Sequence, residues 1–475
     1  MTRPRRIPAM TVALALLGGC AVGPDYHPAP ALPGADAPLV SLNPAAETPA
    51  PPPDDWWRLY NDPRLDQLLQ SAFAANADLQ AAEANLSAAR AVLEGARAGL
   101  YPSTTVKGGA VYGRDAMTDE ILEIGGHPPK TIWTFDALLD VSYEVDLFGR
   151  VRRSIESARA DAEAVAAARD AVKTTVAAET ARAYAQVCAL GEQIAVARHA
   201  LDVVDRETEI TVNRHDAGAN TEFDVVRAQA LDAQVRAAIP PLEGQRRAAL
   251  FQLTALVGRT PANAPVEALA CVAPPQLTAL IPIGDGAALL KRRPDVRQAD
   301  RRMAAAVARI GVAVADLYPR ISLTGLYGGV GSHVSDLTAA RGLTWGLGPT
   351  VSWSFPNQTG PRARIRQAKA NAAAALAQFD GVVLQALRET ETALSAYGAE
   401  LDRRGALAEA DAKSHRAFDL AHDQFLDGAL SNLDLLTAEQ AMVSADSAVA
   451  ASDAALVQDQ IAVFKALGGG WRTDS

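Results

Sequence analysis

The sequence predicts an α+β fold in which two similar halves each combine long helices with two β-strands. The first observation is an internal repeat: residues 78–102 align without gaps on residues 295–319, and ten of these 25 positions are identical. The second is the alternation of apolar and polar residues in stretches such as 131–146, within an otherwise alanine-rich chain. A period of two is typical of a strand with one apolar and one polar face.

Each half follows the same order of elements. A helix comes first and is expected to end at a Tyr-Pro pair, because the helical conformation is disfavoured for the residue before a proline. Two strands follow, then a helical run without internal proline that breaks at Gly218 or Gly428, and then a third helix. The expected helices are 79–99, 150–214, 221–256, 296–316, 362–426 and 431–467, and the expected strands are 103–114, 131–147, 320–331 and 344–355.

The lengths of these helices indicate how they pair. A run of 65 residues would measure roughly 100 Å, far more than a compact domain allows. The two shorter helices of each half would together cover about 86 Å, so we expect one long helix to pair with two shorter ones. Alanine-rich faces permit close approach, and a thin apolar seam is expected at Val165, Val172, Val176, Val187, Leu190, Ile194, Leu201 and Val204.

Composition and charge exclude several classes of protein. The 475 residues carry a formal net charge of −10, which argues against nucleic acid as a partner because phosphate binding needs a basic surface. Hydrophobic residues make up 49% of the chain but aromatic residues only 5%, a composition that favours close-packed helices over a bulky core. Beyond the N-terminus, no apolar run is long enough for a transmembrane helix.

The N-terminus has the features of a bacterial lipoprotein signal. Three arginines precede a short apolar run that ends in Leu17-Gly-Gly-Cys20, the arrangement of a secretory signal peptide with a lipobox. We expect cleavage before Cys20 and lipidation of Cys20. Because alanine rather than aspartate follows Cys20, we expect the lipidated chain to be anchored in the inner leaflet of the outer membrane. An ordinary signal peptide with an incidental cysteine is the alternative.

The strands raise the question of how their sheet is completed. Four strands cannot enclose a pore, because the smallest membrane barrels need eight, and open sheet edges in lipid leave backbone groups unpaired. Three copies of the chain would supply twelve strands, with the polar faces wetted by water in a shared lumen. A soluble β-sandwich is the alternative interpretation.

The remaining cysteines and histidines give no sign of catalysis or of a metal. Cys188 lies in a helical stretch and Cys271 in a loop-like one, so a bridge between them is possible, but two separate thiols are favoured. No Cys/His metal-ligand spacing occurs, and His415 and His422 are interpreted as part of a solvated helix face. We therefore expect no metal, no enzyme activity, and no cofactor apart from the covalent lipid on Cys20.

Several motifs together resemble one family. They are the lipobox with CAVGPDY (20–26), WWRLYNDPRLDQLL (56–69), the Leu-Tyr-Pro junctions, DLFGRVRRSIESARA (146–160) with GPRARIRQAKA (360–370), and ALGGGW (466–471). Over essentially the whole mature chain, the sequence resembles the TolC-type outer-membrane factors, in their OprM-like lipoprotein branch that serves resistance-nodulation-division pumps.

The resemblance implies an architecture and a function. It implies a homotrimer with a 12-stranded transmembrane β-barrel and a long α-helical barrel of coiled-coil helices in the periplasm. It further implies the efflux of small molecules and drugs, together with a periplasmic adaptor protein and an inner-membrane pump. A conduit for type I protein secretion is the alternative, and a lipid-anchored adhesin or structural coiled coil is a third class.

By the resemblance, the periplasmic gate falls on Asp224, Asp434 and Phe425. The adaptor-docking tips fall on Gly218, His215, Gly428 and Leu430. Rings of aspartate at a constriction would attract cations. For both aspartates the alternative is a helix N-cap role, consistent with their position in the first turn of the returning helix.

The chain is expected to divide into six segments. These are a signal peptide (1–19), a proline-rich tether (20–55), a first repeat (56–258), a linker (259–290), a second repeat (291–471) and a C-terminal tail (472–475).

Overall fold

The computed structural model describes residues 21–469, except residues 31, 36, 44, 115–118, 121, 122, 127, 129, 278 and 285. The expected signal peptide, the lipidation site Cys20 and the tail at 472–475 lie outside the described residues. Contacts divide the chain into two units. We name them the sheet unit, from residues 1–29, 86–165 and 299–379, and the helical unit, from residues 30–85, 166–298 and 380–475.

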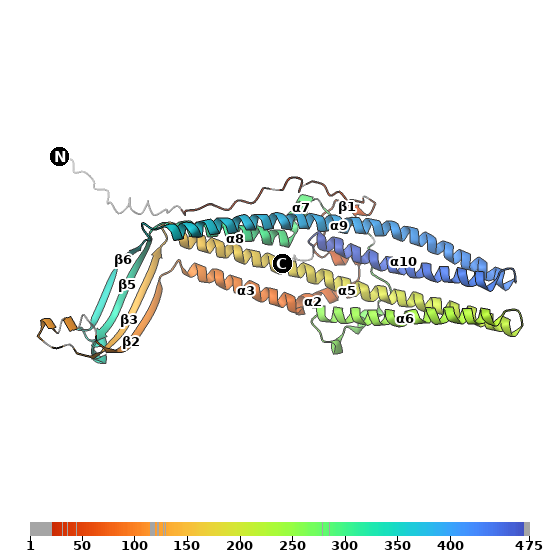
Figure 1. The fold of residues 1–475 in the computed structure, drawn as a ribbon, viewed down its shortest axis with the longest axis horizontal. Coiled ribbons are helices and arrows are strands. Elements are labelled where there is room, and N and C mark those ends of the chain that lie inside the picture. The colour runs from red at the N-terminus through yellow and green to blue at the C-terminus, as the bar shows by residue number, and fades with distance from the viewer. Residues whose placement is uncertain are drawn as a thin grey trace. The chain divides into compact units, whose positions relative to one another are not determined.

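The long helices occur close to the positions that the sequence predicts (Figure 1). Helices α5 and α9 contain 67 and 68 residues, and α6 and α10 contain 35 residues each. Across the described residues, no helix combines the length and the apolar character that crossing a membrane requires. The α-helices are α2 (Pro63–Ala75), α3 (Ala77–Ala98), α5 (Arg150–Asp216), α6 (Glu222–Leu256), α7 (Gly286–Arg292), α8 (Pro294–Ala315), α9 (Thr359–Leu426) and α10 (Asn432–Ala466).

Short elements connect these helices. The chain has 3-10 turns η1 (Trp56–Tyr60), η2 (Pro261–Asn263), η3 (Val266–Ala270) and η4 (Val334–Thr338). In the helical unit, β1 (Glu47–Thr48) pairs in parallel with β4 (Ile281–Pro282). The Val40 and Ser41 amides also donate to Glu391 of α9, at 2.7 and 2.8 Å. The later part of the predicted tether is therefore packed on the helical unit, because its extended backbone finds partners there.

The sheet unit contains a four-stranded antiparallel sheet in the order β2-β3-β5-β6 (Figure 1). Its strands are β2 (Ser103–Gly113), β3 (Ile132–Val145), β5 (Arg320–Gly331) and β6 (Leu343–Ser352). The last strand ends three residues before the predicted limit. Beyond it, the indole N–H of Trp353 donates to the carbonyl of Leu317, at 3.0 Å.

One face of this sheet is apolar and exposed in the single chain. A register row crosses all four strands, pairing Val106 with Leu139, Leu139 with Tyr327, and Tyr327 with Trp345. Their exposed fractions are 80%, 38%, 61% and 73% in the same order. A contiguous apolar surface of this kind marks contact with another protein or with a membrane.

The opposite face of the sheet carries charge. Lys107 Nζ of β2 lies 2.6 Å from Asp140 Oδ2 of β3, and both side chains remain partly exposed. Asp140 follows Leu139 directly, so the two side chains point to opposite faces of the strand. The alternation predicted for residues 131–146 is therefore present as one apolar and one polar face.

Aromatic residues that precede α2 anchor the core of the helical unit. Trp56 is 1% exposed and stacks on Phe464 of α10, with ring centroids 4.8 Å apart. The hydroxyl of Tyr184 donates to Asp62 at 2.7 Å, and Asp62 in turn caps α2. Most of the predicted seam on α5 is buried, at Val176, Val187, Leu190, Ile194 and Val204.

A disulfide bond joins Cys188 of α5 to Cys271, which directly follows η3. The expectation of two separate thiols is wrong. Their Cα atoms lie 4.8 Å apart although 83 positions separate them in sequence. Arg246 of α6 holds the segment against α5 by donating to the carbonyls of Leu269 and Cys271, at 2.8 and 2.6 Å. No local pattern in the sequence reveals this return of the linker onto the middle of a helix.

The bond can be tested by thiol labelling. Under denaturing conditions, we expect an alkylating reagent to label the peptides of Cys188 and Cys271 only after a reductant is added. Replacing both residues by serine should cost about 2–4 kcal/mol of stability, because it releases a long closed loop, and should lower the apparent melting temperature. Labelling of both peptides without reductant would contradict the bond.

Candidate functional site

Two helical turns, between α5 and α6 and between α9 and α10, share one backbone design. In the first, the amide of Ala219 donates to the carbonyl of Arg214 and the amide of Gly218 to that of His215, each at 2.8 Å. The turn at Gly428 repeats both bonds. These pairs form the Schellman motif, whose left-handed residue is usually glycine, and the two glycines have φ angles of +76° and +74°.

Each returning helix begins with a serine or threonine paired with an aspartate three residues later. The amide of Thr221 donates to Asp224 Oδ2 at 3.0 Å, and the amide of Asp224 donates to Thr221 Oγ1 at 3.3 Å. In the second helix, the amide of Asp434 donates to Ser431 Oγ at 3.3 Å, and the Ser431 hydroxyl donates to Asp434 Oδ2 at 2.6 Å. Hydrogen bonds from Thr221 lower the pKa of Asp224. Thr221 and Ser431 are thus the N-cap residues, and each aspartate lies three residues later, where Asp224 completes a capping box.

Phe425 lies at the centre of a small apolar cluster beside the second turn. It is 2% exposed and packs with Ala421 and Leu435, and Leu430 covers the same cluster. Arg214, from the end of α5, places its guanidinium 4.4 Å from the centre of the Phe425 ring. The same guanidinium donates to the Phe425 carbonyl at 2.9 Å. A partly desolvated cation–π contact contributes about 1–2 kcal/mol, so Arg214 connects the first turn to the second.

Further along the same helices lies a group of buried ionisable side chains. Glu439 of α10 is fully buried, and neither of its carboxyl oxygens has a hydrogen-bond partner among the described residues. Glu207 of α5 is 5% exposed, and its Oε1 lies 3.0 Å from Nδ1 of His422 on α9. Burial, followed by the nearby charge of Glu207, raises the pKa of Glu439 to about 8. This carboxyl is therefore protonated at neutral pH.

The predicted site residues fall into two groups. Phe425 and Leu430 share the apolar cluster, whereas His215 lies at the surface with its side chain 40% exposed and its Nδ1 3.4 Å from Asp216. Sequence reasoning missed Arg214 and Glu439. The only available signals were the position of Arg214 beside the predicted turn and the single acidic residue in the stretch 435–442.

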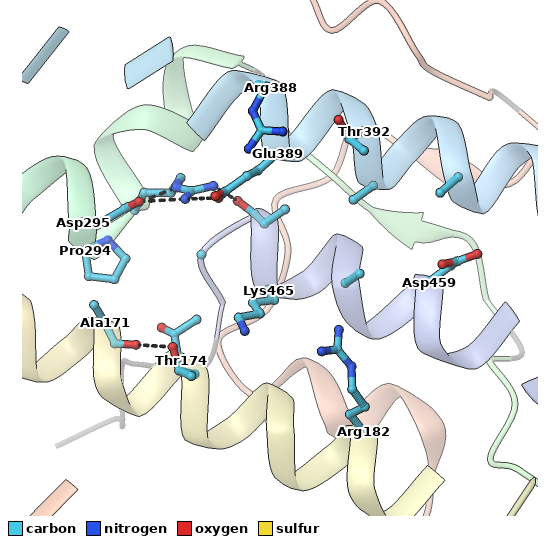
Figure 2. A pocket seen from close by; sticks show the side chains of 17 residues that line it. Ala171, Thr174, Arg182, Pro294, Asp295, Arg388, Glu389, Thr392, Asp459 and Lys465 are labelled. Atoms are coloured by element: carbon cyan, nitrogen blue, oxygen red, sulfur yellow. Dashed lines mark hydrogen bonds and ion pairs between the residues drawn. The ribbon is translucent and has the colours of Figure 1, made fainter. Parts of the chain in front are cut away.

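The helical unit also contains a pocket of about 490 Å³. Figure 2 shows lining residues from four helices, among them Arg182 of α5, Asp295 of α8, Glu389 of α9 and Lys465 of α10. Its most buried charge is Arg293, which lies 2.7 Å from both Asp295 and Glu389 and donates to the Ala466 carbonyl at 2.9 Å. Opposite charges are thus paired in the wall, and the pocket is interpreted as a packing junction between helix ends.

Solved structures share this fold over nearly the whole chain. The outer-membrane channel OprN is 33% identical, with a TM-score of 0.87, and the match covers 95% of this chain and 100% of that one. The open state of the MtrE outer-membrane channel of Neisseria gonorrhoeae is 25% identical, with a TM-score of 0.81 and coverage of 95% and 99%. The fold, the exposed sheet face and the paired turns define a channel of the TolC-like outer-membrane class.

A family model for outer membrane efflux proteins matches residues 68–259 and 287–469, and the chain belongs to this family. The pyoverdine export outer membrane protein OpmQ of Pseudomonas aeruginosa is 31% identical, covering 88% of each chain. The outer membrane protein OprJ of the same species is 30% identical, covering 98% of this chain and 96% of the relative. The protein is thus an efflux channel of the outer membrane that extends into the periplasm, and it is not an enzyme.

Burial of Glu439 predicts a pH dependence of stability. Its folded-state pKa lies near 8, above that of an exposed glutamate. The free energy of unfolding is therefore unreduced at pH values below the pKa of the unfolded state, and it falls as the pH rises from there through 8. Glu439→Gln keeps the group neutral. We therefore expect the variant to have a higher apparent melting temperature than the wild type at pH 9 and the same one at pH 4.

The matched control is Glu409→Gln, which neutralises an exposed glutamate on α9. It should leave the pH dependence of melting unchanged. Equal melting temperatures of Glu439→Gln and the wild type across the whole pH range would show that Glu439 is not held neutral.

Proposed function

We propose that three copies of this chain form one channel, in which four strands from each copy close a 12-stranded barrel. The observation that carries this proposal is the pairing of the sheet: among the described residues, β2 and β6 each pair with a neighbour on one side only. An unpaired backbone group in lipid costs several kcal/mol, and membrane barrels need at least eight strands. Pairing of β6 with β2 of the next copy would satisfy both edges.

The two faces of the sheet fit opposite sides of such a barrel. The row formed by Val106, Leu139, Tyr327 and Trp345 is exposed and apolar, as the lipid-facing surface of a barrel must be. Lys107 and Asp140, on the other face, would then line a water-filled lumen. Aromatic side chains near strand ends suit the membrane interface.

We infer that the cargo consists of small molecules. Relatives are named for the export of pyoverdine, for antibiotic efflux and for toluene efflux, and each of these names denotes small compounds.

A trimeric channel performs no chemical work, so we assign energy input to an inner-membrane pump. The paired turns at Gly218 and Gly428, with His215 and Leu430 beside them, are proposed as the surface that docks a periplasmic adaptor. The lipid on Cys20 would tether each chain to the membrane.

A susceptibility panel on a deletion strain tests this function. We expect the deletion to increase sensitivity to several antibiotics, dyes or solvents, and the wild-type gene to restore resistance. Cys20→Ala should restore it in part, because the barrel still inserts but loses its lipid tether. Unchanged sensitivity to every small molecule, together with loss of a secreted protein from the medium, would favour the protein-secretion alternative instead.

The proposed aspartate rings at the gate predict ion selectivity. Three copies would place three Asp224 and three Asp434 carboxylates around the entrance, which favours cations over anions. In planar bilayers under a KCl gradient, Asp224→Asn with Asp434→Asn should shift the reversal potential toward zero. Asparagine keeps a hydrogen-bond acceptor at each position, so the helix caps are largely retained.

The control removes the caps and keeps the charges. Thr221→Ala with Ser431→Ala deletes both hydroxyls that contact the aspartates, and we expect it to leave the reversal potential unchanged. Cation selectivity that survives the double asparagine substitution would exclude the aspartates from the gate and leave them a capping role.

A further inference from the structure

Helices α9 and α10, which run side by side (Figure 1), carry a second group of ionisable side chains. Asp411 and His415 are four residues apart on α9 and so share one helix face, and Asp446 reaches them from α10. His415 Nε2 lies 2.7 Å from Asp446 Oδ1 and 3.8 Å from Asp411 Oδ1. One imidazole nitrogen and two carboxylate oxygens therefore converge, and all three atoms lie within 4.8 Å of one another.

The three side chains do not satisfy one another. Asp411 Oδ1 is buried and has no hydrogen-bond partner among the described residues. His415 Nε2 lies closer to Asp446, at 2.7 Å, than to Asp411, at 3.8 Å, whereas one cation could contact both carboxylates.

We propose that Asp411, His415 and Asp446 form a binding site for a divalent ion of the zinc class, one per chain. Zinc accepts histidine nitrogen and carboxylate oxygen at about 2.0–2.2 Å, and sites with three protein ligands leave a fourth position for water. Ligand atoms around a tetrahedral zinc are then about 3.3 Å apart. The separations of 2.7 and 3.8 Å from His415 Nε2 bracket this value, and the two carboxylate oxygens lie within 4.8 Å of each other. Side-chain rotations that bring the three atoms to this spacing would complete the site.

The donor set also selects against the common hard cations. Calcium takes six or more oxygen ligands, and magnesium requires near-ideal octahedral oxygen coordination and retains its waters. A site with one imidazole and two carboxylates on neighbouring helices offers neither. A bound zinc would cross-link α9 to α10 through both helices, and this does not depend on the proposed trimer or on its cargo.

Calorimetry with ZnCl₂ on the full-length, untagged and metal-stripped protein in detergent tests the site. We expect one zinc to bind per chain, and His415→Ala and Asp446→Asn each to weaken binding by at least about tenfold, since even groups that only support metal ligands contribute that much. MgCl₂ should give no comparable binding. His422→Ala is the matched control, because it removes a histidine of the same helix that pairs with Glu207 instead, and it should bind zinc like the wild type.

A second measurement covers the possibility that a ligand variant folds poorly. Zinc should raise the apparent melting temperature of the wild type and of His422→Ala, because a ligand that binds only the folded state stabilises it. It should not raise that of Asp446→Asn, whose side chain has nearly the same shape, once circular dichroism has shown that this variant is folded. Absence of zinc binding to the folded wild type, or equal affinity in the wild type and both ligand variants, would overturn the site.

Discussion

Backbone hydrogen bonding at the two outer strands of the sheet is the constraint on which the rest depends. A helix pairs its own amides and carbonyls, so α5 and α9 need partners only for their side chains. A strand does not, and β2 and β6 each lack one neighbour among the described residues. In the proposed barrel the exposed apolar face lies in lipid, which offers those edges no hydrogen bonds. Assembly of several copies would then follow from the sheet itself.

The two turns are alike where backbone geometry requires it and differ where they contact each other. Gly218 and Gly428 occupy equivalent left-handed positions. The residue three positions before the glycine differs, however, because His215 in the first turn corresponds to Phe425 in the second. Arg214 binds that phenylalanine across the two halves. The two turns are thus similar in backbone conformation and complementary in side chains.

Features with a local or periodic cause could be predicted from the sequence. The alternation of apolar and polar residues predicted the strands, and glycine and proline predicted the helix ends. Asp224 and Asp434 each lie three residues after a threonine or serine, as the acidic residue of a capping box does. The disulfide of Cys188 with Cys271 and the contact of Arg214 with Phe425 could not be predicted, because each joins residues brought together only by helix packing. The His415–Asp446 pair spans 31 positions for the same reason, so spacing along the chain did not reveal it.

Small side chains make this packing close, and closeness explains why ionisable groups become buried within it. Among these closely packed helices, Glu439 is fully buried and does not reach water. Burial of a charge without a partner is costly, so the group stays protonated or must meet a cation. Glu439 illustrates the first solution, and the proposed site at Asp411 and Asp446 the second. At Glu439 and at the proposed site, contacts between the helices that carry the paired turns would therefore depend on protons and ions, whereas the sheet is held by backbone hydrogen bonds that neither alters.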